Sequence, residues 1–416
     1  MNYNLKMSNK KKVIAFILDP INLSTGAYKS TIRTLNLLSK RKFKTIVIAD
    51  NSPSSKKANF PKTTKVYRVK SQPLAFDKNL WLALPQLEEL ERIFIKEKVD
   101  IIHTVMPTIA SQRAMKVARK LNLKIVAHSH TQPENFMPYV SKSLWPLIKF
   151  SFNQYLKYFY SKSDVIICPS KFSQELLKQQ KSSFNTVIIS NGINLEHFKS
   201  VNQESKPLQA REYSLSLQMG TNKANRKLRG IKPIWSNKKN EIIKVLYSGR
   251  LDPEKDIPTL VKAFAILEAK NAELNIIGKG LDQEKIEQLV KELNISKKVH
   301  LLGRVSEKVL IENYQNSDIF VLPSVAELEG MVVLEAMACG NPIIVSDSKD
   351  SASKDFVKGN GLLFKAKNPI DLSKKLKILI ENPALRRKMS KRSLENVKEY
   401  DIKKSIQKLE RVYETI

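Results

Sequence analysis

The regular alternation of short apolar runs with amphipathic segments of helical length is the feature that most limits what this chain can fold into. Alternating strand-like and helix-like segments predict a parallel sheet with helices on both faces, which is a doubly wound α/β architecture. In the first half of the chain the predicted strands are 13–18, 45–49, 65–69, 101–103, 125–128, 165–168 and 187–190. The predicted helices between them include 30–39, 84–97, 108–121 and 170–179.

The alternation stops near residue 200 and starts again near residue 242, which divides the chain into two units. The stretch 200–240 lacks periodicity and holds nine Lys or Arg residues against two acidic ones, so we expect a basic insertion or linker there. In the second unit the predicted strands are 244–248, 273–277, 299–302, 319–322 and 342–345, and the predicted helices include 257–270, 283–293, 309–314 and 332–339. The chain should therefore form two facing Rossmann-like domains with a ligand cleft at the carboxyl ends of their strands.

These patterns also set the expected domain boundaries. Residues 1–12 are predicted to form a disordered basic tail, 13–199 the first domain and 241–394 the second. The charged C-terminal segment is helical in pattern, and we expect its last part, about 395–416, to pack back onto the first domain.

The composition limits the partners and the compartment. The chain has 72 Lys and Arg residues against 40 Asp and Glu, which indicates either an anionic partner or a lysine-rich proteome. We expect no nucleic acid partner, because no helix-turn-helix, RNA-recognition or zinc pattern occurs and the basic residues are spread out. The two cysteines, Cys168 and Cys339, lie far apart in apolar runs and predict reduced thiols rather than a metal site. Without a signal peptide or an apolar stretch of about 18–20 residues, we expect a cytoplasmic protein that contacts the inner face of the cytoplasmic membrane only peripherally.

Two cations follow the predicted strand 244–248, in the run Gly249-Arg250-Leu251-Asp252-Pro253-Glu254-Lys255-Asp256. Arg250 and Lys255 lie just before a predicted helix, and cations at a helix N-terminus suit a phosphate group. The alternative is a solvated loop in which Glu254 and Asp256 neutralise them. After the next strand, Gly278 and Gly280 flank a single residue, a weaker pattern that would let the backbone approach a ligand closely.

The segment 323–342 carries the strongest signal for a binding site. It contains a loop with Glu327, then Gly330, then an apolar helix that holds Glu335 and ends at Gly340. The free amide groups at the start of that helix, near Met331 and Val332, favour an anion. Carboxylates are seldom buried without a partner, and they accept hydrogen bonds from sugar hydroxyls. We therefore expect ribose hydroxyls at Glu335 and donor-sugar hydroxyls at Glu327.

Glu327 and Glu335, with seven residues between them, resemble the Glu-x7-Glu motif of the family 4 retaining glycosyltransferases, which have the GT-B fold. The string Glu-Ala-Met-Ala-Cys-Gly-Asn-Pro that starts at Glu335 matches the same family, as do the 249–256 run and the turn Asn191-Gly192-Ile193-Asn194. The resemblance covers nearly the whole chain and breaks only at 200–240.

The resemblance implies a hexosyltransferase that moves a sugar, with retention, from a nucleotide-sugar (a UDP-sugar is favoured), without a metal or other cofactor. The second domain would then bind the donor and the first domain the acceptor. The donor residues implied are Arg250, Lys255, Gly278, Gly280, Gly330, Met331, Val332 and Glu335. The catalytic residues implied are Glu327, His130, Arg250 and Lys255.

On the acceptor side, the segment Ser24-Thr25-Gly26-Ala27 resembles the family's glycine loop, which often has two adjacent glycines where this chain has only Gly26. His128 and His130 follow the predicted strand 125–128. In the family a histidine here faces the transferred sugar; His130 is the better match and His128 the alternative.

The acceptor itself is suggested by a stretch without acidic residues, 135–163. Within it, 142–162 alternates lysines with aromatic and aliphatic residues, which suits an anionic lipid layer; the alternative is a helix packed into the domain core. The loop Leu328-Glu329, which lacks the aromatic residue that many family members carry there, and a loose likeness around Pro138-Tyr139 resemble the glycolipid-forming members. We favour a membrane lipid or lipid-linked glycan as acceptor. A soluble sugar or sugar phosphate is the alternative, and a nucleotide-sugar hydrolase or epimerase of this fold is less favoured.

Overall fold

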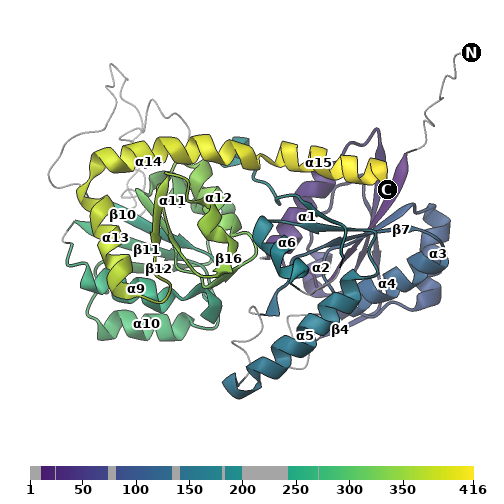
Figure 1. Cartoon of the computed structure of the whole chain (residues 1–416), viewed down its shortest axis with the longest axis horizontal. Coiled ribbons are helices and arrows are strands. Elements are labelled where there is room, and N and C mark those ends of the chain that lie inside the picture. The colour runs from purple at the N-terminus through teal and green to yellow at the C-terminus, as the bar shows by residue number, and fades with distance from the viewer. Residues whose placement is uncertain are drawn as a thin grey trace, which may run out of the picture.

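The chain forms two α/β domains that lie side by side (Figure 1). The computed structural model describes residues 11–23, 25–73, 81–133, 141–179, 183–198, 242–269 and 271–416. The predictions for the linker 200–240, for most of the tail 1–12, for Ser24 and for Pro138-Tyr139 fall outside these residues.

The first domain is built on a seven-stranded parallel sheet in the order β3-β2-β1-β6-β7-β8-β9. Its strands are β1 (Lys12–Leu18), β2 (Phe43–Ala49), β3 (Lys65–Arg68), β6 (Ile101–Thr104), β7 (Lys124–His128), β8 (Val165–Cys168) and β9 (Thr186–Ile188). The connecting helices are α1 (Gly26–Leu37), α2 (Pro53–Lys56), α3 (Leu87–Glu97), α4 (Ile109–Lys120), η3 (Lys142–Leu144), α5 (Trp145–Tyr160) and α6 (Lys171–Lys178). An antiparallel pair that the sequence did not predict, β4 (Ser71–Pro73) and β5 (Trp81–Ala83), lies beside this sheet.

The second domain has a six-stranded parallel sheet in the order β12-β11-β10-β13-β15-β17. Its strands are β10 (Ile243–Ser248), β11 (Ala272–Ile277), β12 (Val299–Gly303), β13 (Ile319–Leu322), β15 (Ile343–Ser346) and β17 (Gly361–Phe364). The helices are η4 (Pro253–Lys255), α9 (Ile257–Ile266), α10 (Gln283–Glu292), α11 (Glu307–Asn316), α12 (Met331–Ala338), η5 (Ala352–Phe356) and α13 (Pro369–Glu381). A short parallel pair, β14 (Ala326–Glu327) and β16 (Asp350–Ser351), lies outside the sheet. The predicted fold class, two facing doubly wound domains, is confirmed.

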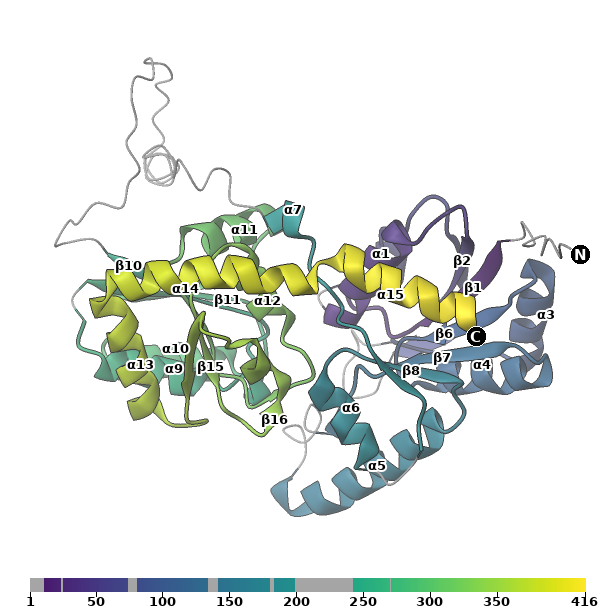
Figure 2. The ribbon, with the colours of Figure 1, turned by 45° about the horizontal axis from the view of Figure 1, so that its top comes forward.

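The C-terminal end of the chain crosses from the second domain to the first. Helix α14 (Pro383–Asn396) covers the second domain, η6 (Val397–Tyr400) follows it, and α15 (Ile402–Thr415) lies along the first domain (Figures 1 and 2). The apolar face of α15, from Ile402 to Tyr413, is buried in a core that it shares with β1 and β2. The hydroxyl of Tyr413 lies 2.5 Å from Nδ1 of His103 on β6.

Two segments that connect the domains, one around Ile193 and one around Asp401, lie side by side. The amide of Ile193, just after the segment that leaves β9, donates to the carbonyl of Tyr400 at 2.8 Å, and the amide of Ile402 donates to Ile193 at 3.0 Å. Gly192 has a φ of +69°, and a Cβ there would lie 2.6 Å from Cα of Ile402, so both the turn and the packing require glycine. The two crossing segments are thus held together by an isolated β-bridge between Ile193 and Asp401.

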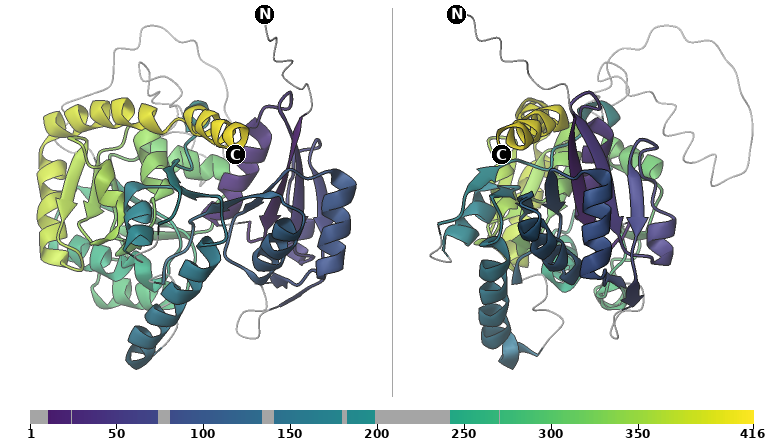
Figure 3. Two further views of the ribbon diagram at one scale, coloured as in Figure 1. Left: turned by 45° about the vertical axis from the view of Figure 1, so that its right-hand side comes forward. Right: turned by 90° about the vertical axis from the view of Figure 1, so that its right-hand side faces the viewer.

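Helix α5 divides into two halves with different surroundings. In its C-terminal half Leu156, Phe159 and Tyr160 belong to the core of the first domain. Its N-terminal end projects beyond the rest of that domain (Figures 1 and 3), where Leu147 is 62% exposed and Phe150 63% exposed. The core interpretation of 142–162 therefore holds for one half only. Across the residues that the structure describes, no helix has both the length and the apolarity needed to cross a membrane.

Candidate active site

The loops that follow β10 and β13 meet at one edge of the second sheet. These two strands are hydrogen-bonded neighbours and run parallel, so their carboxyl ends lie together. The first loop carries Arg250 and Lys255, and the second carries Glu327. The fold therefore brings together residues more than 70 positions apart in sequence.

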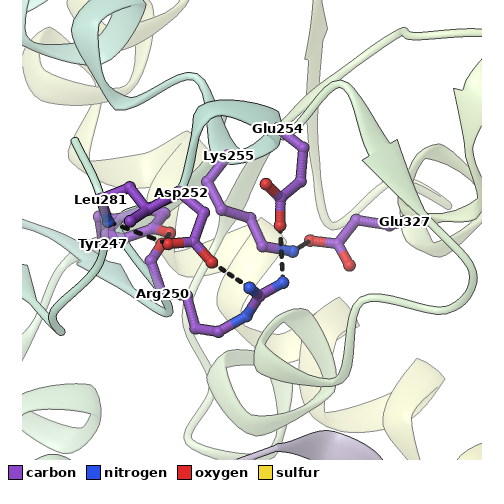
Figure 4. Close-up of polar contacts among 7 residues, drawn as sticks. All are labelled: Tyr247, Arg250, Asp252, Glu254, Lys255, Leu281 and Glu327. Atoms are coloured by element: carbon purple, nitrogen blue, oxygen red, sulfur yellow. Dashed lines mark hydrogen bonds and ion pairs between the residues drawn. The ribbon is translucent and has the colours of Figure 1, made fainter. Parts of the chain in front are cut away.

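Lys255 and Glu327 form the central contact of this edge (Figure 4). The Lys255 ammonium donates to Oε1 of Glu327 at 2.6 Å, and the two side chains are only 12% and 14% exposed. A partly buried pair of this kind gains little net energy, but removing one partner leaves the other charge unpaired. A ligand phosphate could replace the carboxylate as the partner of Lys255.

Arg250 is held by carboxylates of its own loop. Its guanidinium pairs with Asp252 and donates to Oε1 of Glu254 at 2.6 Å (Figure 4). Asp252 and Glu254 are nearly buried, while the Arg250 side chain is 43% exposed. The sequence alternative, a cation neutralised within the loop, therefore describes Arg250 but not Lys255, and Asp252 takes the place that was predicted for Asp256. The two carboxylates fix the Arg250 head group at the open edge.

Gly278 and Gly280, in the loop after β11, have a packing role in this structure. A Cβ on Gly278 would lie 1.7 Å from the carbonyl oxygen of Gly249, and one on Gly280 would lie 2.5 Å from the backbone of Leu251. The space beside each glycine is thus taken by the 249–252 loop. Contact between the two loops is enough to require glycine at both positions, and contact with a donor stays a prediction.

The start of α12 lies beside the Glu327 loop. Gly330, the N-cap, has a φ of +82°, and a Cβ there would lie 2.1 Å from the Ser353 hydroxyl. Met331 and Val332 occupy the first turn, where helix amides have no intrahelical acceptor. The buried hydroxyls of Ser324 and Ser353 have no hydrogen-bond partner among the described residues, which makes them further candidates for ligand contact. Sequence reasoning missed them, because serines in loops are too common to stand out.

Glu335 is buried inside α12 and faces the first domain. Its Oε2 accepts from the Tyr314 hydroxyl at 3.0 Å, and its Oε1 lies 3.8 Å from the guanidinium of Arg33 on α1. Burial raises the pKa of Glu335, and the charges of Arg33 and Lys29 oppose that rise. A carboxylate held by a tyrosine and facing a cation across the cleft is well placed to accept from a diol.

Glu329 is another residue of this edge that the sequence did not predict as a site residue. It is 4% exposed, although the pattern suggested an ordinary polar loop position. Its carboxylate accepts from the Ser190 hydroxyl, and its Oε2 accepts from Nδ2 of Asn191 at 2.6 Å and from the Asn191 amide at 3.2 Å. Burial raises the pKa of Glu329 to about 7, against the lowering effect of these hydrogen bonds. Glu329 thus ties the donor-side loop to the turn where the chain leaves the first domain.

The two histidines after β7 stack on each other at the facing edge of the first domain. The rings of His128 and His130 have centroids 3.9 Å apart and an interplanar angle of 19°, and His103 lies behind them, 5.7 Å from His128. Burial lowers the pKa of His130 to about 4 and that of His128 well below its usual value, so both rings are neutral near pH 7. Nε2 of His128 has no partner among the described residues. A neutral imidazole here can hydrogen-bond a sugar but cannot supply a positive charge.

Gly26 is the first residue of α1, after the N-cap Thr25. Among the described residues, no side chain or backbone atom would lie within 4 Å of a Cβ at this position. The helix start is thus open, which suits a close approach by a ligand.

The fold and this edge define a two-domain protein of the GT-B class. A family model described as "Glycosyl transferases group 1" matches residues 232–395, and one described as "Glycosyltransferase Family 4" matches residues 25–197. The chain belongs to the family 4 type of glycosyltransferases, as the resemblance predicted.

Named relatives include enzymes of glycolipid synthesis. The chain is 25% identical over 319 residues to the alpha-monoglucosyldiacylglycerol synthase of Streptococcus pneumoniae, covering 76% of this chain and 66% of that protein. It is 23% identical over 346 residues to the sulfoquinovosyl transferase SQD2 of Arabidopsis thaliana, covering 81% of this chain and 61% of that protein. The matched region thus spans a little under two thirds of the length of these two relatives.

Solved structures with the same fold cover nearly the whole chain. The sucrose-phosphate synthase of Thermosynechococcus elongatus superposes with a TM-score of 0.76 at 20% identity, covering 97% of this chain and 98% of that one. Anabaena HepE in complex with UDP superposes with a TM-score of 0.75 at 17% identity, covering 97% and 100%. At these identities the likeness establishes the fold.

The substitution Glu329→Gln should change how stability depends on pH. Because the folded pKa of about 7 lies above the ordinary 4.5, the wild-type carboxyl stabilises the fold below pH 4.5 and loses that contribution as the pH rises to 7. Relative to the wild type, the variant should therefore gain stability across this range, by up to roughly 3 kcal/mol. Thermal unfolding of both proteins between pH 4.5 and 7.5 measures the difference in stability. All other ionisable groups are present in both proteins, so their contributions cancel in this difference. Parallel curves would show that Glu329 does not titrate in this way.

Proposed function

We propose that this protein is a retaining hexosyltransferase that uses a nucleotide-sugar, with a UDP-sugar favoured, and transfers the sugar to a membrane lipid or lipid-linked glycan. The single observation that carries the proposal is the Lys255–Glu327 pair, which sets a cation and a sugar-accepting carboxylate 2.6 Å apart beside the start of α12. Relatives named as glycolipid synthases and a likeness in fold to a UDP complex support it.

The donor diphosphate would lie between Arg250, Lys255 and the first turn of α12. Two fixed cations and free helix amides stabilise the negative charge that develops on the departing diphosphate. Glu335 would accept from the ribose hydroxyls, which requires the Arg33 contact to open. Glu327, released from Lys255 by the phosphate, would accept from hydroxyls of the transferred sugar.

The transfer itself would proceed on one face of the sugar, so that the configuration at the anomeric carbon is kept. The acceptor hydroxyl attacks as the bond to the diphosphate breaks, and the leaving phosphate takes the hydroxyl proton. His130, neutral at pH 7, would orient the sugar by hydrogen bonding from the acceptor side. Gly26 at the open start of α1, with His128 beside His130, would border the same space.

The acceptor proposal rests on the projecting half of α5. Exposed Leu147 and Phe150 lie on either side of Lys149 there, which suits the boundary of an anionic bilayer. A cytoplasmic protein bound peripherally to the inner membrane face would present the cleft to a lipid headgroup. A soluble sugar or sugar phosphate is the second candidate, supported by the likeness in fold to a sucrose-phosphate synthase.

The substitution Glu327→Gln should abolish most turnover while leaving the fold intact, because the side chain keeps its shape but loses the charge that Lys255 and the sugar require. We expect a fall of about 10²–10³-fold in kcat, measured as nucleotide release from UDP-glucose, GDP-mannose and UDP-GlcNAc. Glu399→Gln, which removes an exposed carboxylate on η6, is the matched control and should leave turnover unchanged. Unchanged turnover in Glu327→Gln would contradict the assignment of the site.

We further propose that transfer needs no metal ion or other cofactor, because Arg250, Lys255 and α12 supply the charge stabilisation. Among the residues that the structure describes, no group of three or more His, Cys, Asp or Glu side chains is arranged to hold a metal. Nucleotide release should therefore be the same with and without excess EDTA. Loss of turnover that Mn²⁺ or Mg²⁺ restores would refute metal independence.

Membrane contact through α5 should depend on its exposed apolar residues. Leu147→Asp adds a negative charge where an anionic surface is expected, so co-sedimentation with phosphatidylglycerol vesicles should fall at least ten-fold. Ile95→Asp, at a 59% exposed position on α3, is the matched control and should bind like the wild type. Vesicle binding by Leu147→Asp at the wild-type level, or nucleotide release that ignores lipid, would contradict the membrane-acceptor proposal.

A further inference from the structure

A pocket of about 720 Å³ lies between α5, α6, the segment after β7 and the β14–β16 pair. Its volume is in the range of small-molecule sites. The first domain contributes three walls, and the second domain closes the fourth with Leu328, Lys349 and Asp350. Nothing in the donor site described above accounts for this pocket.

Two residues that line the pocket are sequence neighbours of residues in the proposed transfer site. Ser129, which lines it, lies between His128 and His130, and Leu328 follows Glu327 directly. Asp350 pairs in parallel with Ala326 on the neighbouring strand. The lining is therefore continuous in sequence with the two loops that carry His130 and Glu327.

Gln132 provides an independent sign of a ligand. It lines the pocket, is 1% exposed, and neither its Oε1 nor its Nε2 has a hydrogen-bond partner among the described residues. A buried side-chain amide without partners is unfavourable, so such groups are rarely kept unless something else satisfies them. An amide that both donates and accepts matches a hydroxyl, which does the same.

The charged side chains that line the pocket are mostly cationic. Lys149 and Lys157 from α5 and Lys349 from the second domain line it, against the single carboxylate of Asp350. Phe150, another lining residue, is 63% exposed. The lining thus combines a buried amide that can bind a hydroxyl, three lysine ammonium groups, and the exposed ring of Phe150 on the half of α5 that is proposed to contact the membrane.

We propose that this pocket is the acceptor site, that it takes the hydroxylated, negatively charged headgroup of a membrane lipid, and that Gln132 is the residue that selects it. The proposal rests on the proposed function, since it makes the headgroup hydroxyl near Glu327 the one that receives the sugar. The lipid chains would leave past Phe150 along α5. Gln132 binds and positions the headgroup and takes no part in proton transfer.

The test uses the full chain and dihexanoylphosphatidylglycerol, a lipid that is soluble as a monomer. Wild-type protein should bind it by calorimetry, and Gln132→Leu should raise the dissociation constant at least ten-fold without lowering Tm, because Leu removes an unsatisfied buried group. In transfer assays the same variant should raise the KM for lipid and leave UDP binding unchanged. Gln174→Leu is the matched control: it breaks a 3.0 Å hydrogen bond to Thr186, so Tm should fall while lipid binding stays the same.

The outcomes separate the pocket from the donor chemistry. No binding of the short-chain lipid by the wild type, or equal binding by Gln132→Leu, would overturn the pocket assignment. Glycerophosphoglycerol, the same headgroup without chains, should bind at least ten-fold more weakly than the lipid; equal affinity would overturn the lipid source in favour of a soluble acceptor. If the lipid binds through Gln132 but no nucleotide-sugar is consumed, the pocket stands and the proposed transferase function fails.

Discussion

The Lys255–Glu327 ion pair is the contact around which the candidate site is arranged. It joins the loop after β10 to the loop after β13, and it exists because these strands are parallel neighbours whose ends coincide. Both side chains are mostly withdrawn from water, so each charge depends on the other in the free protein. On the proposed function, a diphosphate that binds Lys255 would release Glu327, and donor binding would then prepare this carboxylate to accept from the transferred sugar.

The loop after β13 and helix α12, which follows it, also hold the two domains together. Glu329 binds the Ser190–Asn191 turn, Glu335 faces Arg33 across the cleft, and the Ile193 and Ile402 segments are hydrogen-bonded beside them. Donor-side carboxylates thus contact the first domain at two separate points. A ribose at Glu335 would compete with Arg33, so donor binding is expected to change the relation of the domains as well as the chemistry within one of them.

Much of the fold could be predicted from the sequence, because the strands of a parallel sheet that is buried on both faces consist of apolar residues. The order of strands could not be read, so the meeting of Lys255 with Glu327 came from a resemblance and not from periodicity. Strand β17 was missed because it is only four residues long, and helix α13 was not predicted although Asn368-Pro369 and Asn382-Pro383 mark its two ends. The division of α5 into a buried half and an exposed half could not be predicted either, because it depends on where the helix extends beyond the rest of the first domain.

The site residues that sequence reasoning missed share one physical property. Glu329, Gln132 and Ser353 are polar side chains whose burial depends on contacts far away in the chain, and single-sequence patterns do not report burial of polar loop residues. Gly278 and Gly280 are the opposite case, because the sequence predicted a ligand beside them. In the structure the 249–252 loop packs against both glycines and is enough to explain why glycine is required there.

The central claim is that the edge formed by the β10 and β13 loops binds a nucleotide diphosphate. A crystal structure of the protein with UDP tests it most directly. The account predicts the diphosphate between Arg250, Lys255 and the first turn of α12, the ribose hydroxyls on Glu335, and the Lys255 ammonium moved from Glu327 to a phosphate oxygen. UDP bound elsewhere, or bound here with the Lys255–Glu327 pair intact and Glu335 still facing Arg33, would contradict it.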